Sequence, residues 1–466
     1  MGVLFIPHIK RQGDVILAYT FRGRIHVEEY KLTAKNRTQT IPDPPTVRIS
    51  MNQSIGAPAT PTVKVGDMVK IGQVIGDVPE TALGCPVHAS VSGKVTSIDE
   101  MRVTDGSMNR TVIIENDGNA DVHESVVPFT KSITDVSPEE ITDMIRRAGI
   151  TGMGGAAFPT YAKIKSAVGK AELLIVNCAE CEPFITADHR LLLEETEKVV
   201  GGVKILMRAV GVPRAIIAVE DNKANVKKKL DREIGHSNFI SVKFLKTKYP
   251  QGDERQLIFA LTGRELATGK LPADAGCVIF NAATCAAVYT AFAEGMPLVR
   301  RTVTVSGDCV SSPGNFSVPV GTPASYLVEM AGGLKKAPEK MIAGGPMMGQ
   351  AQWDPDMPTK KSTSSLLLLS DSFSKKPQAP AVCIRCGRCV RNCPMRLMPA
   401  YIASSVINDD MKSAEKFGAM SCVECGSCSY NCPGKVEIVQ YIRVAKNYIR
   451  TENARMKAAR EAAEKK

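Results

Sequence analysis

The chain has 466 residues, enough for three or four domains, and its hydrophobic fraction of 44% and charged fraction of 23% are ordinary for a folded protein. We expect no transmembrane segment, because no stretch approaches the ~18 apolar residues that a bilayer span requires. The N-terminus is too short and too soon charged for a secretory signal, which predicts a cytoplasmic protein. The net charge is +11, but one Trp and 5% aromatic residues offer few platforms for stacking on bases, so we expect no nucleic-acid partner.

Short strands are predicted in the N-terminal part of the chain. Gly-Asp turns between alternating apolar residues occur in 63–76, and a second apolar-rich stretch follows at 86–95. The two stretches resemble the halves of a lipoyl-type barrel-sandwich module. The exposed Lys that carries lipoyl or biotin in such modules is absent here, so we predict no attached group, and we expect His88 to be structural.

A glycine-rich loop separates two predicted helices. Ser137 and Glu140 form a capping box before the first helix, and the loop 152–160 precedes a second helix at 161–167. Glycines before a helix N-terminus let backbone N–H groups close on a phosphate, and Lys163 could reach the same anion. The glycines also fit a tight turn between packed elements, and the local pattern leaves both interpretations open.

Three apolar runs of strand length end near polar residues. The runs are 172–177, 214–220 and 276–281. Because ligands bind at the carboxyl ends of strands in open α/β sheets, we expect the polar side chains near these ends to share a pocket. The candidates are Asn177, Glu180, Glu182, Asp253, Glu254 and Asn281.

Two cysteines in this region, Cys178 and Cys181, have the C-x-x-C spacing of a redox pair. Glutamates lie between and directly after them, and nearby negative charge would raise the pKa of both thiols. We therefore expect these cysteines to serve packing.

The remaining cysteine pattern predicts iron–sulfur clusters. Fourteen cysteines in a cytoplasmic chain argue against disulfides. Eight of them form two runs with the spacing C-x2-C-x2-C-x3-C-P of two-cluster ferredoxins, in which the fourth Cys ligates the other cluster. Gly387 and Gly426 would leave room beside each cube. Structural zinc is the alternative, but it usually takes ligand pairs. We assign Cys383, Cys386, Cys389 and Cys432 to a first [4Fe–4S] cluster, and Cys422, Cys425, Cys428 and Cys393 to a second.

Two segments flank the cysteine-rich part. Pro, Ser and Lys in 351–375 predict a linker. The stretch 441–466 is rich in Lys and Arg and predicts a solvated, frayed basic helix or tail, with contact to an anionic partner or membrane surface as the alternative.

These motifs together resemble a known family. GMGGAAFPTYAK at 152–163 and VNCAECEP at 176–183 are similar to the flavin segments of the 51-kDa NADH-binding subunit of respiratory complex I. With YPQGDERQL at 249–257 and the paired ferredoxin motifs, the chain is more similar still to the C subunits of Rnf complexes, which are membrane-bound, ion-translocating ferredoxin–NAD oxidoreductases. The resemblance covers nearly the whole chain.

The resemblance implies roles for individual residues. The backbone of Gly152, Gly154 and Gly155 would cradle the FMN phosphate. Where the complex I segment has an Asp that contacts the flavin, this sequence has Ala179. The other implied residues are Lys163 and Asn177 for FMN, Glu180 and Glu182 for the flavin and nicotinamide pocket, Asp253 or Glu254 for a second carboxylate there, and Asn281 and Thr284 for the phosphate end.

The resemblance also implies a multidomain fold of α/β and α+β type. Residues 303–345 resemble the soluble ligand-binding (SLBB) β-grasp module. The predicted division is a lipoyl-like barrel-sandwich module at 1–128, an α/β FMN- and NADH-binding domain at 129–300, the SLBB module at 301–350, a linker at 351–375, a ferredoxin-like helical domain with two clusters at 376–440, and a basic C-terminal helix or tail at 441–466.

The expected function is electron transfer between NAD(H), FMN and two [4Fe–4S] clusters, without a side-chain nucleophile. The implied partners are the other subunits of the complex, including a ferredoxin-like iron–sulfur subunit, and ferredoxin indirectly. The implied location is the cytoplasmic face of the membrane. The alternatives are a soluble flavin iron–sulfur reductase of the cobalamin-reductase type, whose modules follow a different order, and a non-catalytic electron-transfer scaffold, which the missing flavin contact at Ala179 would favour.

Overall fold

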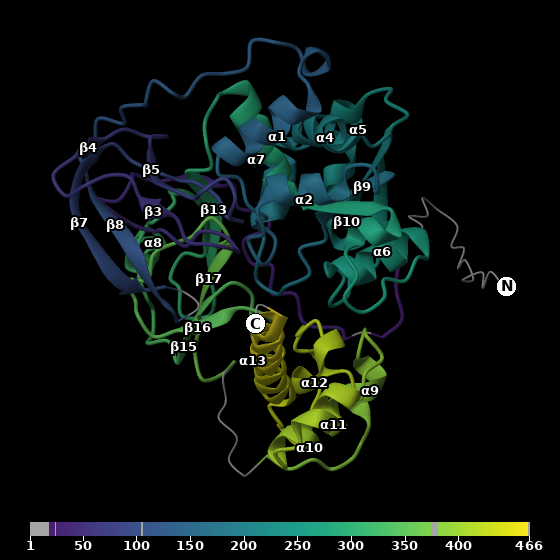
Figure 1. Ribbon diagram of the computed structural model, residues 1–466. Helices are drawn as coiled ribbons and strands as arrows, with labels where there is room; N and C mark the ends of the chain where they lie inside the picture. Colours follow the sequence, from purple (N-terminus) through teal and green to yellow (C-terminus); the bar gives the residue numbers. More distant parts are fainter. Residues whose placement is uncertain (1–17, 24, 104–105, 374–380, 465–466) are drawn as a thin grey trace.

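The computed structural model describes residues 18–23, 25–103, 106–373 and 381–464. They form an N-terminal barrel, an α/β domain, a six-stranded mixed sheet and a helical C-terminal domain (Figure 1). Short 3-10 helices connect several elements: Ile133–Asp135, Asp221–Val226, Pro272–Ala275 and Ala419–Ser421.

The N-terminal barrel consists of two sheets with the orders β2–β8–β7–β4 and β3–β5–β6. Valine and isoleucine side chains from both sheets fill its interior and are almost completely buried, as expected for facing sheets. The barrel-sandwich fold predicted from the two strand-rich stretches is thus confirmed. The strands are Thr46–Ser50 (β2), Thr60–Pro61 (β3), Met68–Val69 (β4), Val74–Asp77 (β5), Val87–His88 (β6), Gly93–Arg102 (β7) and Met108–Asn116 (β8).

The α/β domain is built on a four-stranded parallel sheet of order β11–β10–β9–β12. The strand order reverses between β9 and β12, and such a switch point is where open α/β sheets bind ligands. The strands are Leu173–Cys178 (β9), Arg214–Glu220 (β10), Ile240–Leu245 (β11) and Cys277–Asn281 (β12). The helices are Pro138–Arg147 (α1), Thr160–Ala167 (α2), Ala187–Glu194 (α3), Thr196–Val210 (α4), Lys227–Ile234 (α5), Glu254–Thr262 (α6) and Ala282–Ala293 (α7).

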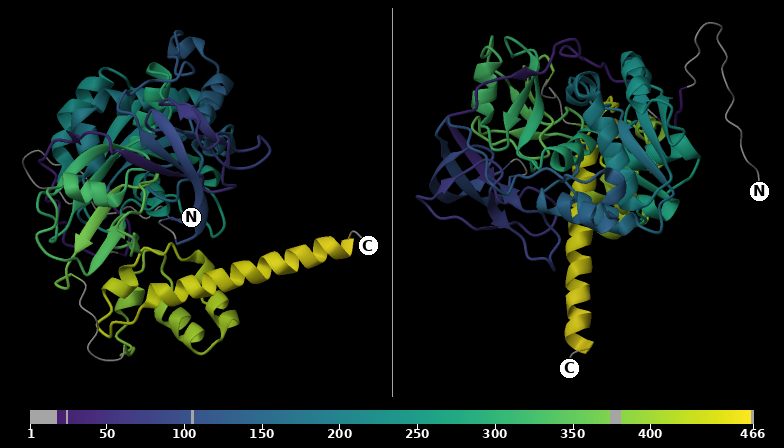
Figure 2. Two further views of the ribbon diagram at one scale, coloured as in Figure 1. Left: turned by 90° about the vertical axis from the view of Figure 1, so that its left-hand side faces the viewer. Right: turned by 90° about the horizontal axis from the view of Figure 1, so that it is seen from above.

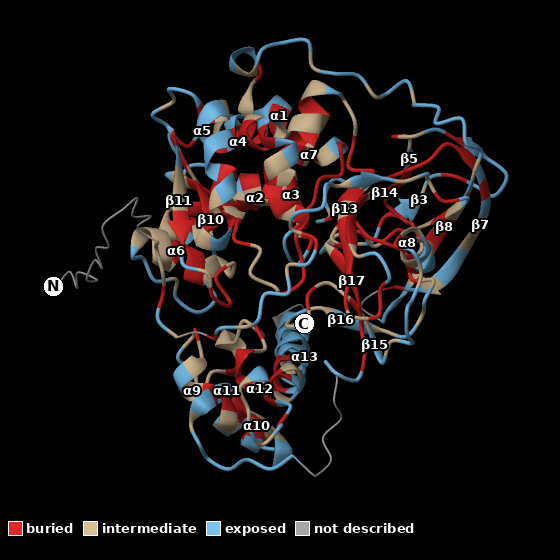
Figure 3. Ribbon diagram, turned by 180° about the vertical axis from the view of Figure 1, so that it is seen from behind, coloured by how far each residue is buried: buried red, intermediate tan, exposed pale blue. Residues whose placement is uncertain are grey.

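Helices cover both faces of this sheet, and buried residues concentrate in its strands (Figure 3). Leu174 and Val176 of β9 pack in one apolar cluster with α1, α4 and α7, whereas Ile175 packs with α6 on the opposite face, because successive strand residues point to opposite sides. The predicted capping box is confirmed: Ser137 Oγ accepts the Glu140 N–H at 3.1 Å, and the Glu140 carboxylate accepts the Ser137 N–H at 2.8 Å.

The six-stranded sheet has the order β1–β14–β13–β17–β15–β16. Helix α8 (Ala324–Met330) packs against it through Ala324 and Leu327. The strands are Gln39–Thr40 (β1), Arg300–Ser306 (β13), Gly314–Pro319 (β14), Lys340–Ala343 (β15), Gln350–Gln352 (β16) and Ser365–Leu369 (β17).

Two of the predicted boundaries need correction. The linker predicted at 351–375 is wrong, because β17 lies inside the sheet, parallel to β13 and antiparallel to β15, with every residue buried. The predicted module 1–128 extends too far toward the N-terminus. Residues 18–43, which we call the N-terminal segment, run along the α/β domain, where Tyr19 bridges to Leu245 and Ile25 to Tyr249, and then add β1 to the six-stranded sheet.

The C-terminal domain is helical. Helix α13 extends far from the body of the molecule (Figure 2). It begins at Ile438, before the predicted tail, and Ile442, Ala445 and Ile449 belong to the domain core, so only its distal part is solvated. No helix in the described ranges is long and apolar enough to cross a membrane. The helices are Arg388–Asn392 (α9), Pro399–Ile407 (α10), Met411–Lys416 (α11), Ser427–Tyr430 (α12) and Ile438–Glu464 (α13).

A buried lysine joins three of these bodies. Lys361 precedes β17 in the chain. Its ammonium group donates to the carbonyl oxygens of Pro86 at 3.0 Å and Gly149 at 2.7 Å. Its backbone N–H donates to Gln53 Oε1 at 3.0 Å. Burial lowers the pKa of Lys361 from 10.5 to about 8. Because the folded state then binds fewer protons than the unfolded state between these values, this group makes the protein more stable as the pH rises from 8 to 10.5.

We predict that Lys361→Met lowers the free energy of unfolding by about 1–3 kcal/mol, because two buried carbonyl groups lose their donor. The difference from the unmodified protein should widen as the pH is raised from 8 to 10, since only the unmodified protein gains stability from loss of the buried charge. Thermal unfolding at several pH values measures both effects. Lys335→Met, at an exposed lysine of the same body, is the control. Equal pH dependence in both variants would contradict the role of Lys361.

Candidate functional site

The glycine-rich loop lies over the N-terminus of α7. Gly152 N–H donates to Phe158 O at 2.8 Å, which closes the loop, and Met153 N–H donates to Thr284 Oγ1 at 3.1 Å. A Cβ on Gly154 would stand 2.9 Å from Asn281 Nδ2, so a larger residue fits here only if the Asn281 side chain moves. The structure therefore brings the predicted residues of the loop together with those of α7.

The same loop carries unused donors. Gly154 and Gly155 are exposed residues, and their backbone N–H groups have no acceptor among the described residues. Such N–H groups near a helix N-terminus suit a phosphate, so the chain's own residues fit the FMN phosphate that the loop motif implies.

The carboxyl ends of β9 and β12 adjoin this loop. Asn177 and Asn281 are register partners on the two strands. Asn177 Nδ2 donates to Gly252 O at 2.8 Å. Asn281 caps α7 by accepting the Ala283 N–H at 2.8 Å, and its Nδ2 donates to Asp188 Oδ2 at 2.6 Å. The predicted polar strand ends thus meet at the switch point of the sheet.

Lys163 and the two acidic residues at the start of α6 border the same region. Lys163 Nζ lies 2.7 Å from Glu254 Oε1 and donates to Ile279 O at 3.1 Å. Asp253 is the N-cap of α6, where its carboxylate accepts the N–H groups of Arg255 and Gln256 at 3.1 and 3.2 Å. Burial raises the pKa of Asp253. Asp253 therefore holds the helix, and Glu254 is the acid that pairs with Lys163.

The loop after β9 carries two half-buried carboxylates. Glu180 accepts the Asp188 N–H at 2.7 Å, and Glu182 accepts the N–H groups of Met347 and Met348 at 3.0 and 2.9 Å. Burial raises the pKa of each glutamate to about 7. Glu180 thus supports the start of α3, and Glu182 ties the loop to the six-stranded sheet's β15–β16 turn.

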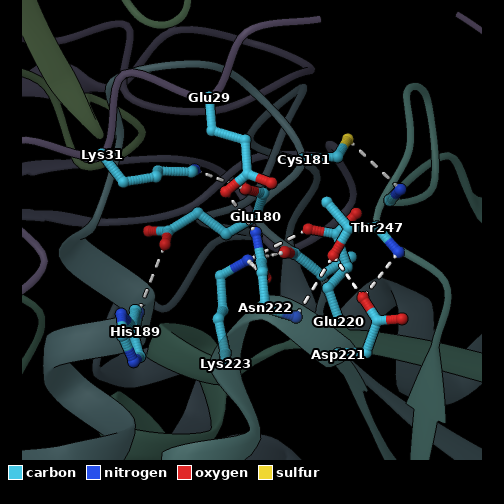
Figure 4. A network of polar contacts seen from close by, with 12 residues as sticks. Glu29, Lys31, Glu180, Cys181, His189, Glu220, Asp221, Asn222, Lys223 and Thr247 are labelled. Atoms are coloured by element: carbon cyan, nitrogen blue, oxygen red, sulfur yellow. Dashed lines mark hydrogen bonds and ion pairs between the residues drawn. The ribbon is translucent and has the colours of Figure 1, made fainter. Parts of the chain in front are cut away.

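Two lysines that sequence reasoning missed hold this loop in place (Figure 4). Lys31 Nζ donates to the carbonyl oxygens of Glu180, Glu182 and Ile185 at 2.8, 2.8 and 2.6 Å. Lys223 Nζ donates to Ala179 O at 2.7 Å and pairs with Glu220 at 3.0 Å. Glu180 has a backbone φ of +49°, and such a conformation persists only where surrounding contacts enforce it.

The sequence contains a hint of the role of Lys223 but none of the role of Lys31. Lys223 follows a strand end at which polar residues were already expected. Lys31 lies in the N-terminal segment, far from the loop in sequence, and no local pattern indicates its contact. Burial lowers the pKa of Lys31.

A pocket opens between the N-terminal segment and the ends of β10 and β11. Its lining combines acidic, basic and amide side chains with one thiol, so it suits a polar ligand. The lining residues are His26, Val27, Glu29, Lys31, Cys181, Glu220, Asn222, Thr247 and Lys248.

The predicted second cluster site is a cavity in the C-terminal domain. Cys393, Cys422, Cys425 and Cys428 all line it, together with apolar residues such as Leu397. These are the four cysteines that the ferredoxin spacing assigns to one cube, and their convergence on an apolar cavity fits a [4Fe–4S] cluster.

The predicted first cluster site lies at the surface. Cys383 and Cys386 are exposed, Cys389 is buried and Cys432 is half-buried. A Cβ on Gly434 would overlap the Val382 carbonyl oxygen, so the chain just after Cys432 packs against the chain that enters Cys383. This packing fits the crossing of Cys432 to the first run that the spacing predicts.

The second cysteine loop packs directly against the α/β domain. The Tyr249 hydroxyl donates to Cys425 O at 2.7 Å. A Cβ on Gly426 would stand 2.9 Å from Met347 O. Tyr249 and Cys425 also share a small apolar cluster with Ile25 of the N-terminal segment and with Cys181. The cavity of the second cluster therefore adjoins the end of the sheet that carries the loop of Glu180.

Four family models match the chain in order. They are the RnfC barrel sandwich hybrid domain at 19–119, the Nuo51 FMN-binding domain at 145–290, the SLBB domain at 302–351 and the 4Fe-4S dicluster domain at 382–437. The folds and sites together define a protein that combines an FMN-binding domain with a dicluster iron–sulfur domain. The SLBB match covers the part of the six-stranded sheet from β13 to β16, without β1 and β17.

Curated relatives extend over almost the whole chain. The C subunit of the Na(+)-translocating ferredoxin:NAD(+) oxidoreductase complex of Acetobacterium woodii is 43% identical, over 92% of this chain and 97% of the relative. The C subunit of the proton-translocating ferredoxin:NAD(+) oxidoreductase complex of Clostridium ljungdahlii is 40% identical, over 94% and 96%. The C subunit of the ion-translocating oxidoreductase complex of Rhodobacter capsulatus is 38% identical, over 97% and 87%.

The chain belongs to this family, the C subunits of Rnf-type ion-translocating oxidoreductase complexes, as its sequence predicted. It is accordingly one subunit of a multi-subunit complex. Among solved structures, an NAD+-reducing [NiFe]-hydrogenase in the H2-reduced state is similar over 66% of this chain and 61% of the matched chain, with 19% identity and a TM-score of 0.49.

We predict that Gly154→Val weakens FMN binding about tenfold or more, because a side chain at this position must displace Asn281 and crowd the loop. Quenching of FMN fluorescence during titration measures the affinity. The melting temperature of the variant without added FMN reports whether the fold is retained. Unchanged affinity in a folded variant would show that the loop does not hold the phosphate.

Proposed function

We propose that this chain is the peripheral NADH- and FMN-binding iron–sulfur subunit of an ion-translocating ferredoxin–NAD oxidoreductase complex. It moves electrons between NAD(H), FMN and two [4Fe–4S] clusters. The observation that carries this proposal is the contact between Tyr249 of the α/β domain and Cys425 in the second cysteine loop. This contact joins a phosphate-suited loop region and a four-cysteine cavity within one packed unit.

The flavin would lie at the switch point between β9 and β12. The exposed N–H groups of Gly154 and Gly155, with Gly152 closing the loop, would hold the phosphate, and Asn281 and Thr284 at α7 would close that end. Lys163 and Asn177 would contact the remainder of FMN. Bound FMN supplies the conversion between two-electron transfer with nicotinamide and one-electron transfer with clusters.

The nicotinamide pocket would be bordered by the loop of Glu180 and Glu182 and by Glu254, with Asp253 holding the helix that carries Glu254. Lys31 and Lys223 fix the loop by binding its carbonyl oxygens. A fixed loop positions the flavin and the nicotinamide without a rearrangement during the reaction.

The alternative function, a non-catalytic electron-transfer scaffold, rests on the missing flavin contact at Ala179. The hydrogen bonds around Ala179 count against this alternative. Ala179 is fully buried, its N–H donates to Asn177 Oδ1 at 3.2 Å, and its carbonyl oxygen accepts the Lys223 ammonium. The position thus orders Asn177 through its backbone. We propose that FMN binds without a carboxylate here.

The two clusters would act in a fixed order. The second cluster, held by Cys393, Cys422, Cys425 and Cys428, would exchange electrons with the flavin, because its cavity borders the α/β domain. The first cluster, held by Cys383, Cys386, Cys389 and Cys432, would then connect to a ferredoxin-like iron–sulfur subunit of the complex. The chain would sit peripherally at the cytoplasmic face of the membrane.

Titration with NADH tests this order. In the reconstituted unmodified protein, NADH should bleach the flavin and both clusters. In Cys386→Ala, which removes a ligand of the first cluster, we expect FMN to stay bound and the second cluster to be reduced. In Cys425→Ala, the flavin should still be bleached, but the first cluster should be reduced much more slowly. Stopped-flow absorbance and electron paramagnetic resonance follow each step.

Three results would count against the proposal. Absence of flavin bleaching in the unmodified protein would remove the NADH reaction. Loss of FMN in Cys386→Ala would show that the flavin and first cluster sites are not separate. The unmodified protein and Cys425→Ala both keep the first cluster. If NADH reduced that cluster at the same rate in both, the proposed order would be rejected.

A further inference from the structure

The two cysteine loops have the same backbone but opposite charge. Arg385 in the first loop and Glu424 in the second occupy equivalent places between the first two cysteines, and each has a backbone φ of +56°. The glycines that follow, Gly387 and Gly426, have φ values of +70° and +80°. Because the backbones match, the difference between the loops lies in their side chains and in what covers them.

The second loop is covered and its charge is neutralised within the chain. Glu424 pairs with Arg443 at 3.1 Å and with Lys446. Cys425 is buried beneath Tyr249, and Gly426 lies against the carbonyl of Met347. This loop is therefore largely covered by other parts of the chain, and its charge is already paired.

The first loop is open. Val382 and Ile384 are 62% and 64% exposed, and the neighbouring Cys383 and Cys386 are also exposed. Exposed aliphatic side chains on both sides of a redox ligand suit a protein interface, whose centre is apolar and whose rim is polar.

The polar rim is positively charged. Arg385, Arg388 and Arg391 follow one another at intervals of three residues, all are exposed, and none has an ion pair or side-chain hydrogen bond within the described ranges. No Asp or Glu occurs between Ala381 and Ser405. Such an uncompensated cationic rim favours an anionic partner and raises the rate of its association.

We propose that residues 382–391, which we call the first-loop surface, form the docking site for an acidic iron–sulfur electron carrier. This inference rests on the proposed function and names the surface through which the first cluster exchanges electrons. In the transfer, the carrier loses one electron and the first cluster gains it, and the reverse holds for flow in the other direction. No bond forms or breaks and no proton is transferred.

A protein carrier accounts for more of this surface than a nucleic acid does. Binding of a phosphate backbone uses cationic residues but leaves Val382 and Ile384 without a partner, and no exposed aromatic side chain is part of the surface to stack on bases. A carrier with carboxylates around an apolar contact complements both parts.

The direct experiment uses a reduced plant-type [2Fe–2S] ferredoxin, a low-potential carrier, mixed with the oxidised full chain. Stopped-flow absorbance measures electron transfer into the clusters, and isothermal titration calorimetry with oxidised ferredoxin measures the Kd separately. We expect the rate and the affinity to fall about tenfold between low and high ionic strength. Ferredoxin with its surface carboxylates amidated should bind weakly at every ionic strength.

Charge reversal locates the site. Arg385→Glu combined with Arg388→Glu should weaken binding and slow transfer by about tenfold or more. Arg450→Glu combined with Arg460→Glu, on the exposed distal part of α13, changes the net charge equally and should stay within about twofold of the unmodified protein. Iron and sulfide counts report whether the clusters are retained. If the double variant loses iron, Arg391→Glu takes its place, with a smaller decrease expected.

Equal effects of the two charge reversals, or binding that ionic strength does not change, would overturn the proposal. The assay contains neither NADH nor nicotinamide chemistry. Failure of NADH to bleach the flavin would therefore remove the proposed function while leaving the docking result intact, and failure of ferredoxin to bind would remove the docking site alone. If a short single-stranded oligonucleotide displaced ferredoxin and bound with equal affinity, the surface would be assigned to nucleic acid and the carrier rejected.

Discussion

The contact between Tyr249 and the Cys425 carbonyl is the constraint on which the arrangement of the chain depends. Tyr249 is 1% exposed, and its hydroxyl reaches across from the α/β domain into the cysteine loop. A buried hydroxyl without an acceptor costs about 1–3 kcal/mol, so this hydrogen bond favours the packing of the cysteine loop against the α/β domain. Gly426 allows the β15–β16 turn to approach the same loop. Three bodies of the protein therefore meet where electrons would pass.

The buried charges around the loop of Glu180 are the second requirement. Lys223 and Glu220 are removed from water and Lys31 and Glu180 are half-buried, which is unfavourable for isolated charges. Here each lysine is bound by carbonyl or carboxylate oxygens, and the loop gains a fixed conformation in return. Lys31 belongs to the N-terminal segment, so that segment orders the site although it joins the parallel sheet only through the bridge of Tyr19 to Leu245. The strained backbone at Glu180 lowers local stability, and the surrounding hydrogen bonds hold it in one conformation. Such strain is common at functional sites.

The parts of the fold that could be predicted from sequence are those whose signal is local. The capping box at Ser137, the apolar run of β9 and the spacing of the cysteines each depend on residues close together in the chain. The failures concern long-range pairing. Ser365–Leu369 looks like a short apolar interruption in a linker, because its partner strands β13 and β15 are distant in sequence. The contact of Lys31 with the loop of Glu180 has the same origin, since a lysine in an extended segment carries no sign of its acceptors.

The two cysteine loops show why a repeated motif does not imply repeated roles. The spacing and the left-handed positions recur, since both loops must wrap a cube of the same size. Charge and exposure do not recur, because one loop faces the α/β domain and the other faces solvent. A cluster surrounded by the protein exchanges electrons only with what the protein packs against it, whereas a cluster at the surface can exchange them with another protein that docks there. The arginines of the first loop lie where a long-range field acts on such an encounter, and equivalent charges in the second loop would have no partner to attract.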